Sequence, residues 1–169
     1  MNSRAVLSAG SNIGDSVGFL RSVLDAAGAE LVAASNVYRT APWGGVEQDD
    51  FVNVTLIVAG DRGPREWLEF CRDCERAADR VRDVRWGPRT LDVDVITVDV
   101  DGVPVTSDDP ELILPHPRAH QRAFVLAPWL EIDPDATLTV DGRPQRVADL
   151  LAELDADEVA GVRRGGPVR

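Results

Sequence analysis

Two aspartates inside an otherwise apolar run are the residues best suited to chemistry. In Leu91-Asp92-Val93-Asp94-Val95 the alternation predicts a strand with its three apolar side chains on one face. Asp92 and Asp94 would share the other face, about 7 Å apart along the backbone. Carboxylate oxygens suit Mg²⁺, which often shares its shell with substrate phosphates. The pair therefore predicts a metal and nucleotide-phosphate site; the alternative, a merely solvated strand face, fits poorly with the low strand propensity of aspartate.

Positive charge gathers just before this strand. Residues 80–89 hold one acid and four arginines, which are Arg80, Arg82, Arg85 and Arg89. Guanidinium groups bind phosphate bidentately and keep their charge at neutral pH. Together with the aspartates they would neutralise a polyphosphate from two sides, as phosphoryl transfer requires. On charge alone, ordinary surface ion pairs explain the segment equally well.

Composition narrows the function classes. The 169 residues include 18 basic ones, all arginine, against 29 acidic ones, and the net charge of −11 argues against nucleic-acid binding. No apolar run approaches the ~20 residues of a membrane helix, and no signal-peptide pattern opens the chain, which favours a cytoplasmic protein. We expect a single domain over residues 1–158, a flexible tail over 159–169, and a monomer.

The periodicity predicts the order β-α-β-β-α-β. The expected strands cover residues 5–9, 31–38, 51–58 and 91–98, and the expected helices run from Asp15 or Ser16 to Gly28 and from Pro64 to about Arg80. Loops are expected at 39–50 and 80–88. This order is that of an α+β, ferredoxin-like sandwich, a central antiparallel sheet with both helices packed on one face. A C-terminal extension follows, with a hairpin tip at Gly102, an apolar piece at 124–130 and a last helix holding Val147 and Leu154.

Weaker features accompany the aspartates. Aromatic and amide residues in or beside the loop at 39–50, which are Tyr38, Trp43, Phe51 and Asn53, could enclose a flat heterocycle or simply pack together. His116 could bind phosphate, although a lone loop histidine is usually just exposed. Cys71 and Cys74 form one C-x-x-C without a second pair and lie on an apolar helical stripe, so we interpret them as core residues rather than zinc ligands. Gly10-Ser11-Asn12-Ile13-Gly14 lacks the third glycine of a dinucleotide loop.

With these residues assembled, the chain resembles the 6-hydroxymethyl-7,8-dihydropterin pyrophosphokinases of folate biosynthesis. The block from Arg85 to Asp94, RWGPRTLDVD, resembles the family signature. Three further blocks agree in order and spacing: Gly10-Ser11-Asn12; Tyr38-Arg39-Thr40 with Pro42 and Phe51-Val52-Asn53; and Pro115-His116-Pro117-Arg118 with Arg122 and Phe124. The resemblance implies a ferredoxin-like fold and transfer of the β,γ-diphosphate of ATP to the pterin hydroxymethyl group, releasing AMP.

The resemblance also implies roles for individual residues. Asp92 and Asp94 would hold two Mg²⁺ ions, and Arg80 and Arg89 would act on the transition state. The ATP-binding positions would be Glu75, Arg80, Arg82, Arg85, Trp86, Arg89, His116 and Arg122. The pterin-binding positions would be Thr40, Pro42, Trp43, Phe51, Asn53, Trp86 and Phe124. The implied partners are therefore small molecules, ATP and the pterin.

This chain departs from the family pattern at a few positions. Ala41-Pro42-Trp43 stands where Pro-Pro-Leu is frequent, Phe51 stands where tyrosine is frequent, and the loop from Arg82 to Trp86 is one residue shorter than in some members. Two rival functions remain open at this point. One is a non-catalytic ferredoxin-like module that binds a small ligand or partner, and the other is a two-metal phosphohydrolase that needs no pterin.

Overall fold

The computed structural model describes residues 1–41, 50–82 and 90–168, without the side chains of 80–82. Its main sheet contains the strands β1 (Ser3–Ser11), β2 (Leu31–Ala34), β3 (Tyr38–Thr40), β4 (Phe51–Gly60), β5 (Asp92–Val100), β6 (Val103–Pro104) and β11 (Val162–Arg164). The helices are α1 (Ser16–Ala27), α2 (Pro64–Arg82), α3 (Ala123–Ile132), α4 (Val147–Glu153) and α5 (Ala156–Ala160). Two small hairpins pair β7 (Ser107–Asp109) with β8 (Leu112–Leu114) and β9 (Thr137–Val140) with β10 (Arg143–Arg146).

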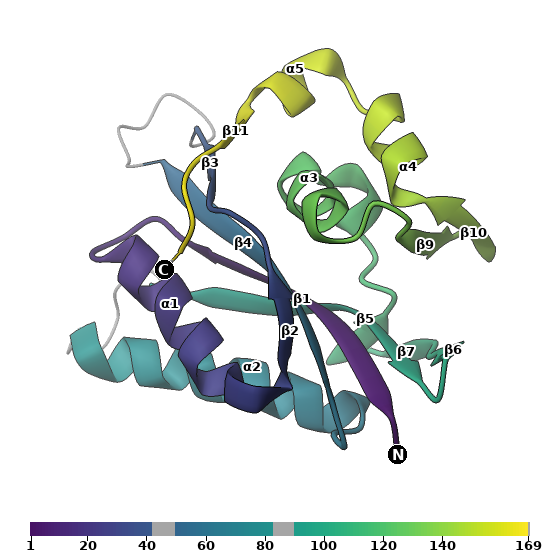
Figure 1. Ribbon diagram of the computed structural model, residues 1–169, viewed down its shortest axis with the longest axis horizontal. Coiled ribbons are helices and arrows are strands. Elements are labelled where there is room, and N and C mark those ends of the chain that lie inside the picture. The colour runs from purple at the N-terminus through teal and green to yellow at the C-terminus, as the bar shows by residue number, and fades with distance from the viewer. Residues whose placement is uncertain (42–49, 83–89, 169) are drawn as a thin grey trace.

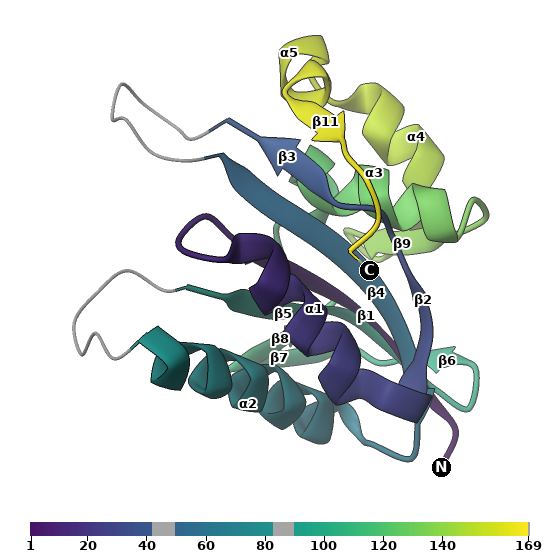
Figure 2. The same cartoon turned by 60° about the vertical axis from the view of Figure 1, so that its left-hand side comes forward.

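The main sheet is antiparallel, in the order β11-β3-β4-β1-β5-β6, and β2 also pairs with β4. Helices α1 and α2 cover one face, while α3 and α4 lie on the other (Figure 1, Figure 2). The predicted ferredoxin-like sandwich with two helices on one face is therefore confirmed. None of the described helices is long and apolar enough to cross a membrane.

Two hydrophobic cores hold these layers together. One, between the sheet and the α1–α2 layer, contains Leu7, Leu56 and Trp67. Cys71 and Cys74 are buried in it, as expected from their stripe on α2, and burial raises the pKa of both thiols, that of Cys74 to about 11. The second core, which contains Leu126 and Trp129, lies between the opposite sheet face and α3.

The sequence predicts several elements at their observed positions. Helix α1 begins after Asp15, whose carboxylate accepts a hydrogen bond from Gly18 N (3.1 Å), and ends at Gly28. The tip at Asp101-Gly102 has positive φ at both residues, as a tight hairpin requires. Helix α2 continues to Arg82, two residues beyond its expected end. The strand expected at 31–38 is instead two strands. At Ser35 the N–H still donates to Thr55 O (2.9 Å), but the side-chain hydroxyl takes the place of the backbone carbonyl and accepts the Thr55 N–H at 3.0 Å.

The C-terminal segment is paired and packed, so the expectation of a flexible tail at 159–169 is wrong. Residues Val162–Arg164 pair with β3, Gly165 and Gly166 exchange hydrogen bonds with Val37, and Val168 is 3% exposed within the first core. The last helix is also followed by a further one, α5. The apolar piece expected at 124–130 is helix α3. A tail rich in glycine and arginine is ordered here because edge strand β3 offers backbone partners that only the folded sheet creates.

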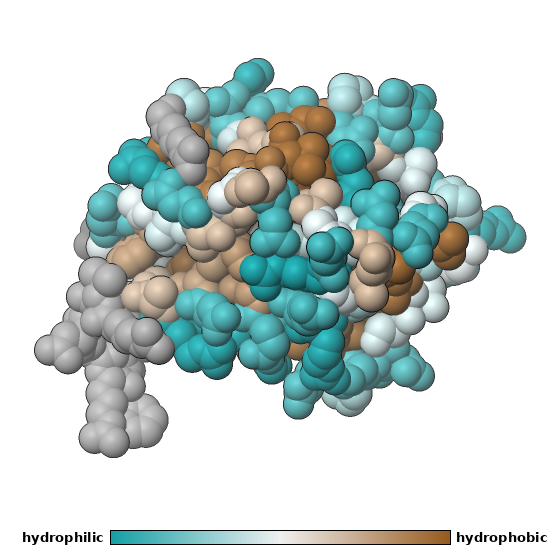
Figure 3. All heavy atoms as spheres, turned by 60° about the horizontal axis from the view of Figure 1, so that its bottom comes forward, coloured by the Kyte–Doolittle hydropathy of each residue, from teal (hydrophilic) through white to brown (hydrophobic). Residues whose placement is uncertain are grey.

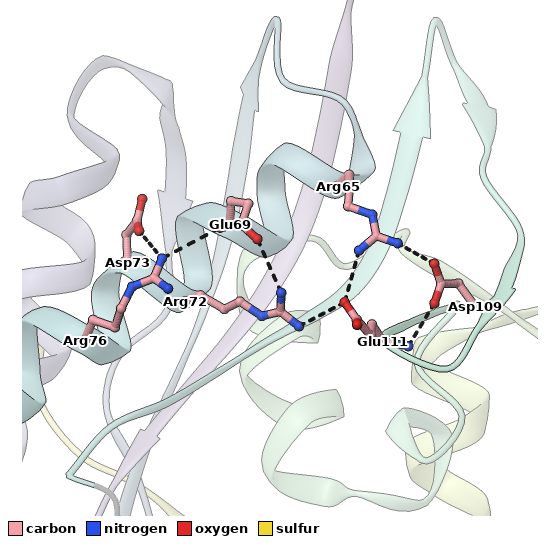
Figure 4. Close-up of polar contacts among 7 residues, drawn as sticks. All are labelled: Arg65, Glu69, Arg72, Asp73, Arg76, Asp109 and Glu111. Atoms are coloured by element: carbon pink, nitrogen blue, oxygen red, sulfur yellow. Dashed lines mark hydrogen bonds and ion pairs between the residues drawn. The ribbon is translucent and has the colours of Figure 1, made fainter. Parts of the chain in front are cut away.

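The outer face of the α1–α2 layer is polar. Viewed with the α2 side forward, hydrophilic residues predominate and hydrophobic ones are interspersed (Figure 3). Along α2, arginines alternate with acids and reach the β7–β8 hairpin: Arg65 and Arg72 both bind Glu111, at 3.1 and 3.4 Å (Figure 4). Exposed pairs of this kind contribute little stability each, so we assign the network to solubility and to holding the hairpin.

Candidate active site

Asp92 and Asp94 project from the same face of β5, as their spacing predicts. Both are exposed, whereas Leu91, Val93 and Val95 are at most 5% exposed and belong to the first core. The β1–β5 register shifts between Val6 and Leu7, so the alternation changes phase at this point. Ile96, which the register skips at the shift, follows Asp92 and Asp94 on the same face and is fully buried in the second core. The bulge thus separates a polar half of this sheet face from a half that α3 covers.

Cross-strand pairing brings other predicted residues beside the carboxylates. Gly10 on β1 lies opposite Asp92 on one side and opposite Asn53 of β4 on the other. Directly paired residues share a sheet face, so Asp92, Gly10 and Asn53 form one row. A Cβ built on Gly10 would lie 2.6 Å from Asn53 Oδ1. The glycine therefore provides the space that the Asn53 side chain occupies.

Asn53 connects this row to the predicted pterin-binding residues of β3. Its Nδ2 donates to Thr40 Oγ1 at 3.3 Å, and Thr40 is paired with Phe51. Asn53 is 5% exposed, while Thr40 and Phe51 are half-buried. An amide carries two N–H donors and one acceptor oxygen, so with one N–H bound to Thr40 it still has a donor and an acceptor for the edge of a flat ring.

A second group of predicted residues approaches the carboxylates from the start of α3. Arg122 Nη1 lies 3.9 Å from Asp94 Oδ2, and its guanidinium lies 5.6 Å from the ring centroid of Phe124. His116 is held by its own N–H, which donates to Ile96 O at 2.8 Å. Carboxylate, arginine and histidine are therefore brought together from segments distant in the sequence.

The protonation of His116 follows from its surroundings. Burial lowers its pKa, the negative charge of Asp94 opposes this effect, and Arg122 and Arg118 reinforce it. The neutral imidazole is thus favoured at pH 7. Its Nδ1 accepts the Arg118 N–H at 3.2 Å, which leaves the proton on Nε2. Nε2–H is then a hydrogen-bond donor suited to a phosphate oxygen.

Glu75 reaches β5 from helix α2. Its Oε2 accepts a hydrogen bond from Val93 N at 3.0 Å. Val93 lies between the two aspartates, so this bond fixes the backbone that carries them. The resemblance to the family implies only an ATP-binding position for Glu75. Its bond to the backbone of β5 is not predicted, because a side-chain bond to a strand N–H leaves no pattern in the sequence.

Several predicted site residues fall outside the described residues, either wholly or in their side chains. These are Pro42, Trp43, Arg80, Arg82, Arg85, Trp86 and Arg89. The residues that the structure brings onto one sheet face or beside it are Thr40, Phe51, Asn53, Asp92, Asp94, His116, Arg122 and Phe124. Gly10 belongs to one of the sequence blocks that resemble the family, but the sequence assigns it no role. Its contact with Asn53 depends on the strand register, which no local pattern shows.

Paired carboxylates with an arginine and a neutral histidine close to one of them, on an antiparallel sheet of ferredoxin-like topology, fit a phosphoryl-transfer enzyme. Comparison with known proteins gives the family. The profile described as 7,8-dihydro-6-hydroxymethylpterin-pyrophosphokinase (HPPK) matches residues 6–134. The chain belongs to this family of pyrophosphokinases.

Individual relatives agree with this assignment. The 2-amino-4-hydroxy-6-hydroxymethyldihydropteridine pyrophosphokinase of Mycobacterium tuberculosis is 52% identical over 166 residues, covering 95% of this chain and 88% of the relative. The protein of the same name from Bacillus subtilis is 37% identical over 136 residues, covering 78% and 79%. A crystal structure of Plasmodium falciparum HPPK-DHPS with pterin and p-hydroxybenzoate has a TM-score of 0.66 at 14% identity. It covers 90% of this chain, which spans 43% of that longer protein, and supports the fold alone.

Proposed function

We propose that this chain transfers the β,γ-diphosphate of ATP to 6-hydroxymethyl-7,8-dihydropterin in folate biosynthesis. The hydroxymethyl oxygen attacks the β-phosphorus and loses its proton to solvent, the bond between the β-phosphorus and the α,β-bridging oxygen breaks, and AMP leaves. The observation that carries the proposal is the row Asp92-Gly10-Asn53. In this row a carboxylate for the phosphate chain and an amide for the pterin lie on one sheet face, on either side of Gly10.

Asp92 and Asp94 are the residues that would hold Mg²⁺, and we propose two ions. Their exposed carboxylates share a strand face, and Mg²⁺ usually takes one or two carboxylates together with substrate phosphates and water. In residues 1–41, 50–82 and 90–168 no group of three His, Cys, Asp or Glu side chains gathers. When bound, Mg²⁺ neutralises charge on the triphosphate and polarises the reacting phosphorus.

We assign the phosphate chain to Arg122 and His116 among the described residues. Arg122 is close enough to Asp94 to lie beside phosphate held there, and the Nε2–H of His116 donates without adding charge. We also propose that Arg80, Arg82, Arg85 and Arg89 bind the triphosphate, with Arg80 and Arg89 stabilising the charge that develops during transfer. Glu75 and Trp86 would line the nucleotide side.

We assign the pterin ring to the β3–β4 end of the same face. Asn53 would recognise the ring edge by hydrogen bonds, and Phe124 would stack on the ring face. Thr40 and Phe51 would border it from β3 and β4, with Pro42, Trp43 and Trp86 completing the set. The proposal also includes a monomeric, cytoplasmic enzyme.

The nucleotide product tests the reaction. The chain is incubated with ATP and Mg²⁺, with and without 6-hydroxymethyl-7,8-dihydropterin, and AMP is separated from ADP. AMP that forms only when the pterin is present supports diphosphate transfer. ADP would indicate transfer of a single phosphate, and pterin-independent consumption of ATP would indicate a hydrolase; either result would overturn the proposal.

A further inference from the structure

Glu131, near the C-terminal end of α3, lies outside the set of residues assigned above, yet it collects several polar contacts. Its carboxylate accepts the backbone N–H of Asn36 at 2.9 Å and the hydroxyl of Tyr38 at 2.8 Å. Arg164 Nε of β11 lies 3.3 Å from the same carboxylate, which is only 19% exposed. One acid therefore joins helix α3 to the start of β3 and to the C-terminal strand.

The C-terminal segment 162–168 holds β3 from its other side. β3 has three residues, and it would be the edge of the sheet without β11, whose Val162 and Arg164 pair with Thr40 and Tyr38. The segment continues along Val37, which donates to Gly166 O at 2.9 Å. It ends with Val168 in the first core, where Val168 O accepts from Arg21 Nη2 at 3.1 Å. A short edge strand is thus held from both sides.

β3 in turn places residues on the pterin side of the site. Tyr38 is paired directly with Asn53, so their side chains lie next to each other on the face that α3 covers. Thr40, two residues further along, accepts the hydrogen bond from Asn53 Nδ2. A shift of β3 would therefore move both neighbours of Asn53.

We infer that Glu131 is a positioning residue for pterin recognition, and that it acts by fixing Tyr38 and the C-terminal segment 162–168 against β3. The inference rests on the proposed function. It predicts an asymmetric defect: loosening Glu131 or Arg164 weakens the pterin side, while Asp92, Asp94 and Arg122 remain in place. Residues 162–168 lie beyond residues 6–134, which the family model matches. The evidence for the docking of this segment against β3 is therefore the set of contacts described above.

The test compares four variants by steady-state kinetics. Glu131→Gln keeps the shape but removes the charge and one acceptor oxygen, and Arg164→Gln removes the ion pair from a side chain that is 61% exposed. Arg164→Lys retains the charge and tests rescue. Arg65→Gln is the matched control, because Arg65 is similarly exposed (55%) and binds two acids on the opposite side of the sheet.

We expect Glu131→Gln to raise KM for the pterin about tenfold, a typical size for a residue acting through neighbours. Arg164→Gln should raise it less, about threefold, because the Arg164 ion pair is exposed. KM for ATP should stay within about twofold, as for independent sites. Arg164→Lys should recover most of the loss, and Arg65→Gln should change neither constant. Faster hydrogen exchange at the Val37 amide in Arg164→Gln would show that the segment has loosened.

Equal increases in both KM values, or an unchanged pterin KM in both Glu131→Gln and Arg164→Gln, would overturn the inference. The unaltered chain separates this result from failure of the proposed function. If the unaltered chain forms pterin-dependent AMP while the variants show no asymmetry, only the positioning role is wrong. If the unaltered chain forms none, the proposed reaction itself is wrong.

Discussion

Asn53 Oδ1 lies 2.6 Å from the point where a Cβ atom on Gly10 would stand. The two residues face each other across the β1–β4 pairing, and Asp92 completes their row on β5. A glycine in the sheet therefore leaves the space in which the buried Asn53 amide lies, and this glycine is paired directly with Asp92. A glycine within a strand often marks such a close approach.

Gly10→Ala should displace Asn53 and impair pterin use. The added methyl group cannot coexist with the present amide position, and overpacking of this kind costs about 1–3 kcal/mol of unfolding free energy. We expect a higher KM for the pterin, measured at saturating ATP. Gly63→Ala is the control, since its Cβ would meet no atom closer than 3.7 Å. A pterin KM in Gly10→Ala equal to that of Gly63→Ala would refute the role given to Asn53.

Tyr38 should titrate far above an ordinary tyrosine. Burial, its hydrogen bond to Glu131 and the charge of that carboxylate raise its pKa from 10.0 to about 12, with Arg164 opposing the shift. The native state thus keeps a proton that the unfolded chain releases above pH 10. Stability from this group is complete below pH 10 and is lost as pH rises towards 12.

The measurement is direct because Tyr38 is the only tyrosine in the chain. Phenolate absorbance should rise near pH 10 in denaturant and only near pH 12 in the native protein. Over that interval the free energy of unfolding should fall by about 1.4 kcal/mol per pH unit. Tyr38→Phe should remove this contribution. A native midpoint near pH 10 would show that Tyr38 is neither buried nor bound to Glu131 in solution.

Glu75 should act through the backbone of β5. Glu75→Ala removes the acceptor of the Val93 N–H, and leaving a donor of this partly buried bond without a partner costs about 1–3 kcal/mol. We expect lower kcat, because Val93 stands between Asp92 and Asp94. Glu75→Gln keeps an acceptor oxygen and should retain most of the activity. If both substitutions lowered ATP affinity equally with little effect on kcat, Glu75 would act on the nucleotide itself.

The ion pairs along α2 should matter little for catalysis. Glu111 is 59% exposed and binds Arg65 and Arg72 (Figure 4). Glu111→Gln should lower the free energy of unfolding by less than about 1 kcal/mol, and added salt should reduce the difference further. Chemical denaturation of both proteins at low and at high salt measures this difference in the free energy of unfolding. A change in kcat on substitution would contradict the separation of this surface from the site.

Local patterns explain why much of the fold was predictable. The alternation at 51–58 and 91–98 and the cap at Asp15 act over a few residues, and each is found where the sequence places it. A second Asp-Gly pair, Asp141-Gly142, has the same hairpin signal as Asp101-Gly102 and forms the turn that connects β9 to β10. The periodicity of the sequence does not predict this hairpin, although its turn carries a local signal.

Other features depend on contacts between distant residues. The break between β2 and β3 follows from Ser35 bonding to Thr55, and the docking of 162–168 depends on an edge that exists only after folding. The same holds for the site. The spacing of Asp92 and Asp94 predicts their shared face, whereas the Gly10–Asn53 contact and the Glu75 bond require the strand register.

The central claim is that the β5 carboxylates support diphosphate transfer, and one matched pair of variants tests it most directly. Pterin-dependent AMP formation is measured for Asp94→Asn and for Asp99→Asn, which removes a carboxylate further along the same strand, paired with Arg4. We predict that Asp94→Asn lowers kcat by roughly 10³-fold or more while the protein stays folded, and that Asp99→Asn retains near-normal turnover. Near-normal turnover in Asp94→Asn, or equal losses in both variants, would contradict the account.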